Sequence, residues 1–181
     1  MTSTMPDLQD AGVRLRRPCE ADIDARFALG TSADIARMFG VSRENVRPFT
    51  RAAAEGWVRN FDQHPHAWII EAEGSLIGEV RLDRIDLQDR RASMAIGIYD
   101  TACLGHGFGS KAIKLVLGYA FGAMRLHRIS VRVLAYNHRA IRAYEKCGFV
   151  AEGRERETAF VDGHWHDDIM MGVLAHEFAT L

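Results

Sequence analysis

The sequence predicts an α/β fold with a mixed, mostly antiparallel, twisted sheet of about seven strands and flanking helices. Three observations support this prediction. Before residue 100, apolar stretches alternate with short polar turns, which is typical of an antiparallel meander. A glycine-rich turn then opens an amphipathic helical segment. A strand, another helix and a closing hairpin follow, so that helices interrupt the order of the strands.

The first third of the chain contains one short strand and two helices by this reading. Val13 and Leu15 alternate with arginines, which predicts a strand. A helix follows over 21–29, and a second helix begins near Thr50, whose hydroxyl suits an N-cap. Residues 30–49 show no clear period. The apolar residues that share a face in the two helices are Ile23, Phe27, Leu29, Ala53, Trp57 and Phe61.

The middle of the chain predicts three antiparallel strands over 68–70, 76–82 and 92–99. Turn-like residues separate them, at Glu73-Gly74 and over 86–90. The elements expected after the meander are a helix with the apolar stripe Ile113, Val116, Leu117 and Ala120, a strand over 129–133, a helix over 137–147, and hairpin strands over 149–160 and 169–174.

The length of 181 residues fits one domain, which we place at 11–181, after a polar and acidic flexible tail over 1–10. Lys and Arg number 23 against 24 for Asp and Glu, so no large basic field for nucleic acid is expected. The N-terminus lacks the features of a secretory signal, and no apolar run reaches the ~20 residues that cross a bilayer. We therefore expect a cytoplasmic protein without a membrane partner.

Neither a disulfide framework nor a metal site is expected. Cys19, Cys103 and Cys147 are widely spaced and form no CxxC pair, which suits a reducing cytoplasm. The pairs His64-x-His66 and His164-x-His166 lie in turn-rich sequence without a third ligand at an established spacing. Trp57, Trp68 and Trp165 are most simply residues of the core or of a pocket wall.

The glycine-rich turn at 105–110 is a candidate anion site, because backbone N–H groups and the helix dipole converge where such a turn enters a helix. Its G-x-G-x-G pattern is not the dinucleotide fingerprint G-x-G-x-x-G. Gly109-Ser110-Lys111 lacks the Gly-Lys-Ser/Thr order of a P-loop. Taken alone, the segment is equally consistent with a flexible bend.

The segment 137–149 gives the turn its context. It reads Asn-x-x-Ala-x-x-x-Tyr-x-x-x-Gly-Phe, and together with the glycine loop ahead of it resembles the coenzyme A-binding half of the GNAT superfamily of N-acetyltransferases. Leu15-Arg16-Arg17-Pro18 with Asp22 resembles the opening of the branch that contains the Rim-type and spermidine acetyltransferases. The segment 153–157, with Gly163 and Asp167, resembles its closing hairpin. The resemblance covers nearly the whole domain and implies the GNAT fold.

The resemblance implies acetyl-coenzyme A as co-substrate. It assigns the pantetheine arm to the backbone of Gly97, Ile98 and Tyr99, the pyrophosphate to the loop, and a polar contact to Asn137. Arg142 and Lys146 lie four residues apart on the helix and suit the phosphates, or equally a solvated face. Leu104 departs from the family's Gln or Arg at that position. The loop residues implied in binding are Leu104, Gly105, His106, Gly107, Phe108, Gly109 and Ser110.

Acetyl transfer to an amine needs a base for the ammonium proton and an acid for the departing thiolate. Tyr144 occupies the family's general-acid position, and its phenol is protonated at neutral pH; packing alone is the alternative role. Glu79 lies on one face of its strand, near the middle, and is the candidate base. A surface ion pair with Arg81 is the alternative for that carboxylate.

The expected acceptor is a primary amine of a small molecule, either a polyamine or an aminosugar of the antibiotic type, which would connect the activity with resistance. A protein N-terminus, acetylated as in ribosomal-protein modification, and a catalytically silent coenzyme A-binding module are the alternatives. A homodimer fits the resemblance, because related enzymes are often dimers. Acidic residues that could line an amine pocket, or simply cap helices, are Glu20, Asp22, Asp24, Asp34 and Glu44.

Overall fold

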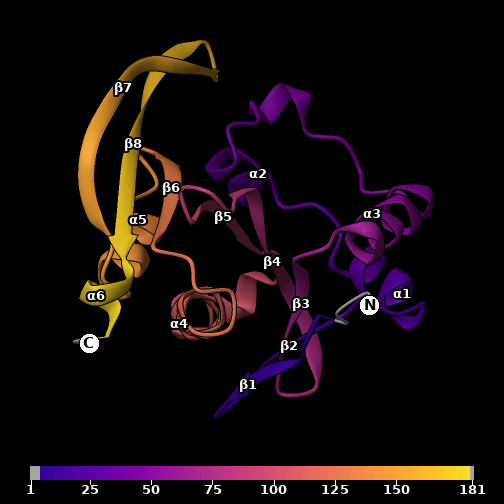
Figure 1. Ribbon diagram of the computed structural model, residues 1–181. Helices are drawn as coiled ribbons and strands as arrows, with labels where there is room; N and C mark the ends of the chain where they lie inside the picture. The colour runs from indigo at the N-terminus through magenta and orange to yellow at the C-terminus, as the bar shows by residue number, and fades with distance from the viewer. Residues whose placement is uncertain (1–4, 180–181) are drawn as a thin grey trace.

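The computed structural model describes residues 5–179, which form one eight-stranded sheet with helices on both sides (Figure 1). The spatial order of the strands is β1-β2-β3-β4-β5-β6-β8-β7. All neighbours are antiparallel except β5 and β6, which are parallel. The strands are β1 (Leu8–Asp10), β2 (Val13–Arg16), β3 (Ala67–Ala72), β4 (Ser75–Asp86), β5 (Arg91–Ile98), β6 (Arg128–Leu134), β7 (Val150–Val161) and β8 (His164–Leu174).

Within the described residues, six α-helices and two 3₁₀ turns accompany the sheet. In Figure 1, α4 and α5 lie on one side of the central strands, and α1 and α3 lie on the other side. This layering buries a core between α4 and the sheet that includes Trp68, Ile113 and Leu117. The helices are α1 (Ala21–Leu29), α2 (Ala33–Met38), η1 (Arg43–Asn45), α3 (Arg51–Gln63), η2 (Thr101–Cys103), α4 (Phe108–Phe121), α5 (His138–Glu145) and α6 (Ala175–Phe178).

The mixed α/β sheet and the three-stranded meander are confirmed, with β3, β4 and β5 antiparallel in sequence order. The extra strand is β1, within the segment that the sequence assigned to a flexible tail. Leu8–Asp10 pair with β2 across a turn at Gly12, which has φ +84°. Met5 is buried, and Trp68 donates its indole N–H to the Pro6 carbonyl at 2.9 Å. The tail prediction is therefore wrong for residues 5–10, while residues 1–4 lie outside the described part of the chain.

In two helices, the residues that are buried differ in part from the apolar residues predicted to be buried. In α1, Phe27 is 43% exposed, whereas Asp22 and Arg26 are buried. Asp22 accepts hydrogen bonds from both terminal nitrogens of Arg16 at 2.8 Å and from the Cys19 amide at 2.7 Å. For Asp22, burial of charge is thus compensated by ion pairing, a possibility that apolar periodicity ignores. In α3, Thr50 caps the helix and Phe61 is buried, both as predicted, whereas Ala54 and Val58 are buried in place of Ala53 and Trp57.

The region without a sequence period, 30–49, contains α2 and η1. The helix α2 has only six residues, and its position depends on tertiary hydrogen bonds. Asp162, in the turn between β7 and β8, accepts from Arg37 Nε at 2.9 Å and from the Arg43 amide at 2.8 Å. The Tyr136 hydroxyl donates to the Arg37 carbonyl at 2.6 Å. These bonds hold α2 beside the end of β6.

Candidate functional site

A cleft of about 500 Å³ opens between β5 and β6. The parallel pairing joins only residues 91–93 of β5 to 128–130 of β6. Beyond these residues the two strands separate, and residues 94–98 and 132–134 become opposite walls of the cleft. The backbone of β5 continues to pair with β4 on its other side. Its edge toward the cleft can therefore hydrogen bond to an extended ligand.

The glycine loop lies along this cleft, before α4. Gly105 and Gly107 have φ values of +83° and +82°, a conformation that suits glycine. Gly107 is the N-cap of α4, and no side chain caps the helix there. The first helical bond runs from the Lys111 amide to the Gly107 carbonyl at 3.1 Å. The amides of the first turn therefore have no partner within the helix and are suited to an anion.

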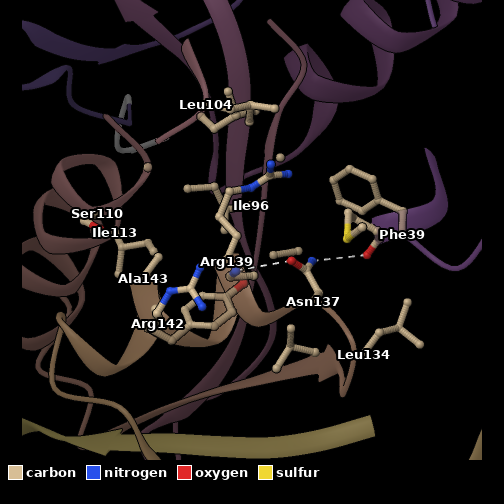
Figure 2. Close-up of a pocket in the computed structure, with 18 of the residues that line it drawn as sticks. Phe39, Ile96, Leu104, Ser110, Ile113, Leu134, Asn137, Arg139, Arg142 and Ala143 are labelled. Atoms are coloured by element: carbon tan, nitrogen blue, oxygen red, sulfur yellow. Dashed lines mark hydrogen bonds between the residues drawn. The ribbon is translucent and has the colours of Figure 1, made fainter. Parts of the chain in front are cut away.

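The helix α5 supplies cationic and polar groups to the same cleft. Arg139, Arg142 and Lys146 line it, and Figure 2 draws Arg139 and Arg142 among the side chains of its wall. Asn137 caps α5, because its Oδ1 accepts from the Ala140 amide at 3.2 Å. Its Nδ2 donates to the Met38 carbonyl at 3.4 Å, which ties α5 to the end of α2 (Figure 2). Both polar groups of the Asn137 amide are thus already engaged.

Tyr144 lines the cleft with a side chain that is only 6% exposed. Its ring lies 5.4 Å from the ring of Phe149 between centroids. Burial, and then the neighbouring Cys147, raise the pKa of the phenol above its ordinary value. The hydroxyl is therefore protonated throughout the neutral range, which is the state that a proton donor requires.

Glu79, the sequence-predicted base, is opposite Gly97 in the β4–β5 register and is 7% exposed. Its carboxylate accepts hydrogen bonds from the indole N–H of Trp57 and from Arg81 Nη1, the latter at 3.2 Å. Burial raises the pKa of this carboxyl above its ordinary value, while Trp57, Tyr99, Arg81 and Arg26 oppose the rise. A carboxylate with a raised pKa is a better proton acceptor than an exposed one.

Arg26 lies beside Glu79, between aromatic rings. Its guanidinium carbon is 3.8 Å from the ring centroid of Phe49 and 4.2 Å from that of Tyr99. Nη1 donates to the Gly30 carbonyl at 3.0 Å. The pKa of the Tyr99 phenol is raised by burial and then by the negative charge of Glu79. The buried carboxylate is therefore enclosed by aromatic and cationic side chains from α1, α3 and the end of β5.

The structure brings most of the sequence-predicted binding residues to the cleft and leaves four of the predicted site residues outside its lining. His106, Phe108, Tyr99 and Glu79 are not among the lining residues, and Tyr99 packs against Arg26 instead. The predicted residues that line the cleft are Gly97, Ile98, Leu104, Gly105, Gly107, Gly109, Ser110, Asn137, Arg142, Tyr144 and Lys146.

Sequence reasoning missed the wall of the cleft formed by α2 and β8. Ile35, Met38 and Phe39 line this end, and Figure 2 shows Phe39 and Leu134 beside Asn137. Asp168 of β8 lines it as well, 3% exposed, and accepts from Thr158 Oγ1 at 2.8 Å. Arg139 was also missed, although its spacing from Arg142 and Lys146 on one helical face was a usable signal.

The acidic residues of the first third do not form a wall of the cleft. Asp22 pairs with Arg16, Asp24 with Arg51, and Asp34 with Arg43. None of the five acidic residues proposed for an amine pocket lines the cleft. Three of them form ion pairs with arginines, which favours the alternative role in the first turns of helices.

The histidine pairs have other partners. His64 Nε2 lies 3.0 Å from Asp83 Oδ1, and His164 Nδ1 lies 2.9 Å from the Asp162 carbonyl oxygen. Across residues 5–179, no group of three or more His, Cys, Asp or Glu side chains is arranged to hold a metal ion.

Within the part of the chain that the structure describes, none of the helices has the length and apolar character to cross a membrane.

A sheet whose parallel strands part beside a glycine turn and a cationic helix suits an extended, phosphate-bearing ligand. The profile described as "Acetyltransferase (GNAT) domain" matches residues 13–150 of this chain. The chain belongs to the GNAT acetyltransferase family.

Curated relatives and solved structures agree with this family. The chain is 31% identical over 117 residues to the spermidine N(1)-acetyltransferase of Escherichia coli K12, covering 65% of this chain and 62% of that protein. It is 34% identical over 118 residues to that of Vibrio cholerae, covering 65% and 68%. The alignment thus spans less than two thirds of the Escherichia coli relative.

A solved structure, of spermidine N-acetyltransferase from Vibrio cholerae in complex with CoA and spermine, aligns with a TM-score of 0.77 and 25% identity. The alignment covers 94% of this chain and 99% of that one. The fold likeness therefore extends well beyond the segment matched by sequence.

Proposed function

We propose that this chain transfers the acetyl group of acetyl-coenzyme A to a primary amine of a small molecule by direct attack on the thioester. The cleft between β5 and β6 is the observation that carries the proposal. A glycine turn, a cationic helix face and a buried tyrosine meet along it, and each suits one part of an acyl-coenzyme A.

The residues of this chain fit that co-substrate. The first-turn amides of α4 suit a pyrophosphate, and Arg139, Arg142 and Lys146 add positive charge. The cleft edge of β5 suits the amide groups of an extended arm. Leu104 supplies an apolar side chain where the family usually has a polar one, while the backbone of the loop is unaffected. When bound, acetyl-coenzyme A supplies the activated acetyl group.

Two side chains perform the proton transfers in this proposal. Glu79 accepts a proton from the acceptor ammonium, directly or through one water, so that the nitrogen lone pair can form the new C–N bond. As the C–S bond breaks, the Tyr144 hydroxyl donates its proton to the departing sulfur. The raised pKa of each group favours its task, because Glu79 is a stronger base and Tyr144 stays protonated.

The acceptor class rests on the named relatives. Two curated relatives and one solved structure are spermidine acetyltransferases, which favours a polyamine as the acceptor, with an aminosugar as the other small-molecule candidate. A curated relative from Bacillus subtilis, 28% identical over 106 residues, is named a putative ribosomal N-acetyltransferase. That name keeps a protein N-terminus as the second candidate acceptor.

Incubation with acetyl-coenzyme A and an amine panel tests the proposal. The panel contains spermidine, spermine, an aminoglycoside and a peptide with a free N-terminus, with thiol release and product mass as readouts. We expect a mass increase of one acetyl group on a small amine, matched mole for mole by free thiol. Acetylation of the peptide alone selects the protein acceptor. Coenzyme binding without acetylation of any amine supports a silent binding module. A homodimer stays a prediction, which sedimentation of the same sample tests.

A further inference from the structure

A ladder of alternating charges runs along one face of β4, away from Glu79. Residues 79, 81 and 83 are two apart, so their side chains share a face of the strand. Arg81 lies between the two carboxylates: its Nη1 donates to Glu79 Oε1 at 3.2 Å and its Nε donates to Asp83 Oδ2 at 3.0 Å. His64, which follows α3, contacts the other oxygen of Asp83 at 3.0 Å.

The ladder connects a buried carboxylate to groups in partial contact with water. The side chain of Glu79 is 10% exposed, whereas those of Arg81 and Asp83 are 34% and 32% exposed. Solvent and salt screen the attraction between the Arg81 guanidinium and Glu79 only weakly, because the Glu79 carboxylate is buried. Asp83 occupies the opposite edge of the Arg81 fork, so the guanidinium is held in place rather than free to turn into solvent.

The other groups that face Glu79 differ from Arg81 in kind or in attachment. Trp57, from α3, donates a neutral indole N–H. Tyr99, after β5, contributes a phenol, and Arg26, from α1, is stacked against Phe49 and Tyr99 and bonded to the Gly30 carbonyl. Among the described residues, Arg81 is therefore the cation that donates a hydrogen bond to this carboxylate.

We propose that Arg81 is a positioning residue that keeps Glu79 in its charged, proton-accepting form, and that Asp83 fixes Arg81 for that purpose. The inference rests on the proposed role of Glu79 as base. Desolvation favours the neutral carboxyl, and a neutral carboxyl cannot accept the ammonium proton. Arg81 offsets this effect, so the base remains ionised at a pH where its burial alone would protonate it.

A titration followed by NMR tests this proposal, because it measures the ionisation of Glu79 directly. The protein is labelled with ¹³C at the glutamate side-chain carboxyl, and the Glu79 resonance is assigned by its absence in Glu79→Gln. Titration then compares wild type with Arg81→Gln and Arg81→Lys. Loss of a cation beside a carboxylate raises the carboxyl pKa, and for a half-exposed partner we expect a rise of about one unit in Arg81→Gln. Lysine retains the charge and should restore most of that shift.

Arg84→Gln is the matched control, since it removes the same charge from an exposed residue of the same strand. We expect it to leave the Glu79 resonance titrating as in wild type. In Arg81→Gln alone, the acidic limb of the pH–rate profile should shift to higher pH, by the same amount as the pKa measured from the Glu79 resonance. A shift equal in both glutamine variants, or none in Arg81→Gln, overturns the inference. Thermal melts show whether a variant is folded. If Arg81→Gln is not folded, Arg81→Met carries the test, because it keeps an aliphatic side chain, removes the charge and should raise the Glu79 carboxyl pKa in the same direction.

Failure of the proposed function is distinguishable from failure of this inference. If Glu79→Gln leaves the pH–rate profile unchanged, the base assignment is wrong and the inference falls with it. If Glu79→Gln alters the profile but Arg81→Gln leaves both the profile and the resonance unchanged, only the role of Arg81 is wrong.

Discussion

Gly107→Val tests whether the loop before α4 binds the coenzyme through its backbone. Gly107 has φ +82°, and a Cβ built on it meets no heavy atom within 4 Å. The cost to folding therefore comes from the left-handed backbone, about 1–2 kcal/mol for a non-glycine residue. For a chain of this size that corresponds to a fall in Tm of roughly 3–6 °C.

The effect on binding should be separate and larger. Gly107 lines the cleft, so the valine methyls would occupy the space through which an anion approaches the helix amides. Loss of one charge-assisted hydrogen bond is worth about 1.5–3 kcal/mol, which is roughly a 10- to 100-fold weaker Kd. Isothermal titration calorimetry with coenzyme A measures the Kd of each protein.

Gly74→Val is the matched control. Gly74 has φ +78°, also meets nothing within 4 Å, and lies in the turn between β3 and β4, outside the cleft lining. Both variants should lose a similar amount of stability, but only Gly107→Val should lose coenzyme affinity. A Gly107→Val protein that melts like the control and binds coenzyme A within twofold of wild type would refute the assignment of the loop.

Three further predictions follow from individual side chains. Glu79→Gln should lower turnover most on the acidic limb of the pH profile, where the amine is protonated and a base matters most; an unaltered pH–rate profile would contradict this. Arg142→Gln should weaken coenzyme A binding several-fold at low salt and less at high salt, as titration at two ionic strengths would show; equal loss at both would indicate a packing role. Asp22→Ala should destabilise the fold by on the order of 3 kcal/mol in urea unfolding. The variant leaves the Arg16 guanidinium, whose side chain is 17% exposed, with Glu71 as its remaining carboxylate partner. The pKa of Asp22 is lowered in the folded state, where the hydrogen bonds from Arg16 and Cys19 outweigh burial. Its contribution is therefore present above the unfolded pKa and lost as pH falls through the folded pKa, so the variant should show less acid-dependent loss of stability than wild type.

The elements that could be predicted from the sequence are those specified by a local pattern. The meander, the glycine turn and the capped helix α5 each have a short pattern of their own, and all are present. Tyr144 and the glycines of the loop also line one cleft, as the family resemblance implies. Local periodicity and turn chemistry were sufficient here because each element is either amphipathic or bounded by glycine.

The parts that were not predicted depend on contacts between distant residues. The helix α2 lies in a region without a period, and Asp162 and Tyr136 hold it from elsewhere in the chain. Arg26 and Asp22 are buried on α1, where an apolar pattern would place them outside. The pairing of acidic residues with arginines could not be read from the sequence, because each pair is set by the tertiary fold. Asp168 reaches the cleft only because β8 pairs with β6.

Turnover of Tyr144→Phe on the best acceptor amine tests the account most directly. The substitution keeps the ring beside Phe149 and removes only the buried hydroxyl, so coenzyme affinity and Tm should change little. Positioned acid catalysis is worth about 10²- to 10⁴-fold, and we predict that kcat falls by that order. Equal kcat for wild type and Tyr144→Phe, with equal coenzyme affinity, would contradict the assignment of Tyr144 as the proton donor.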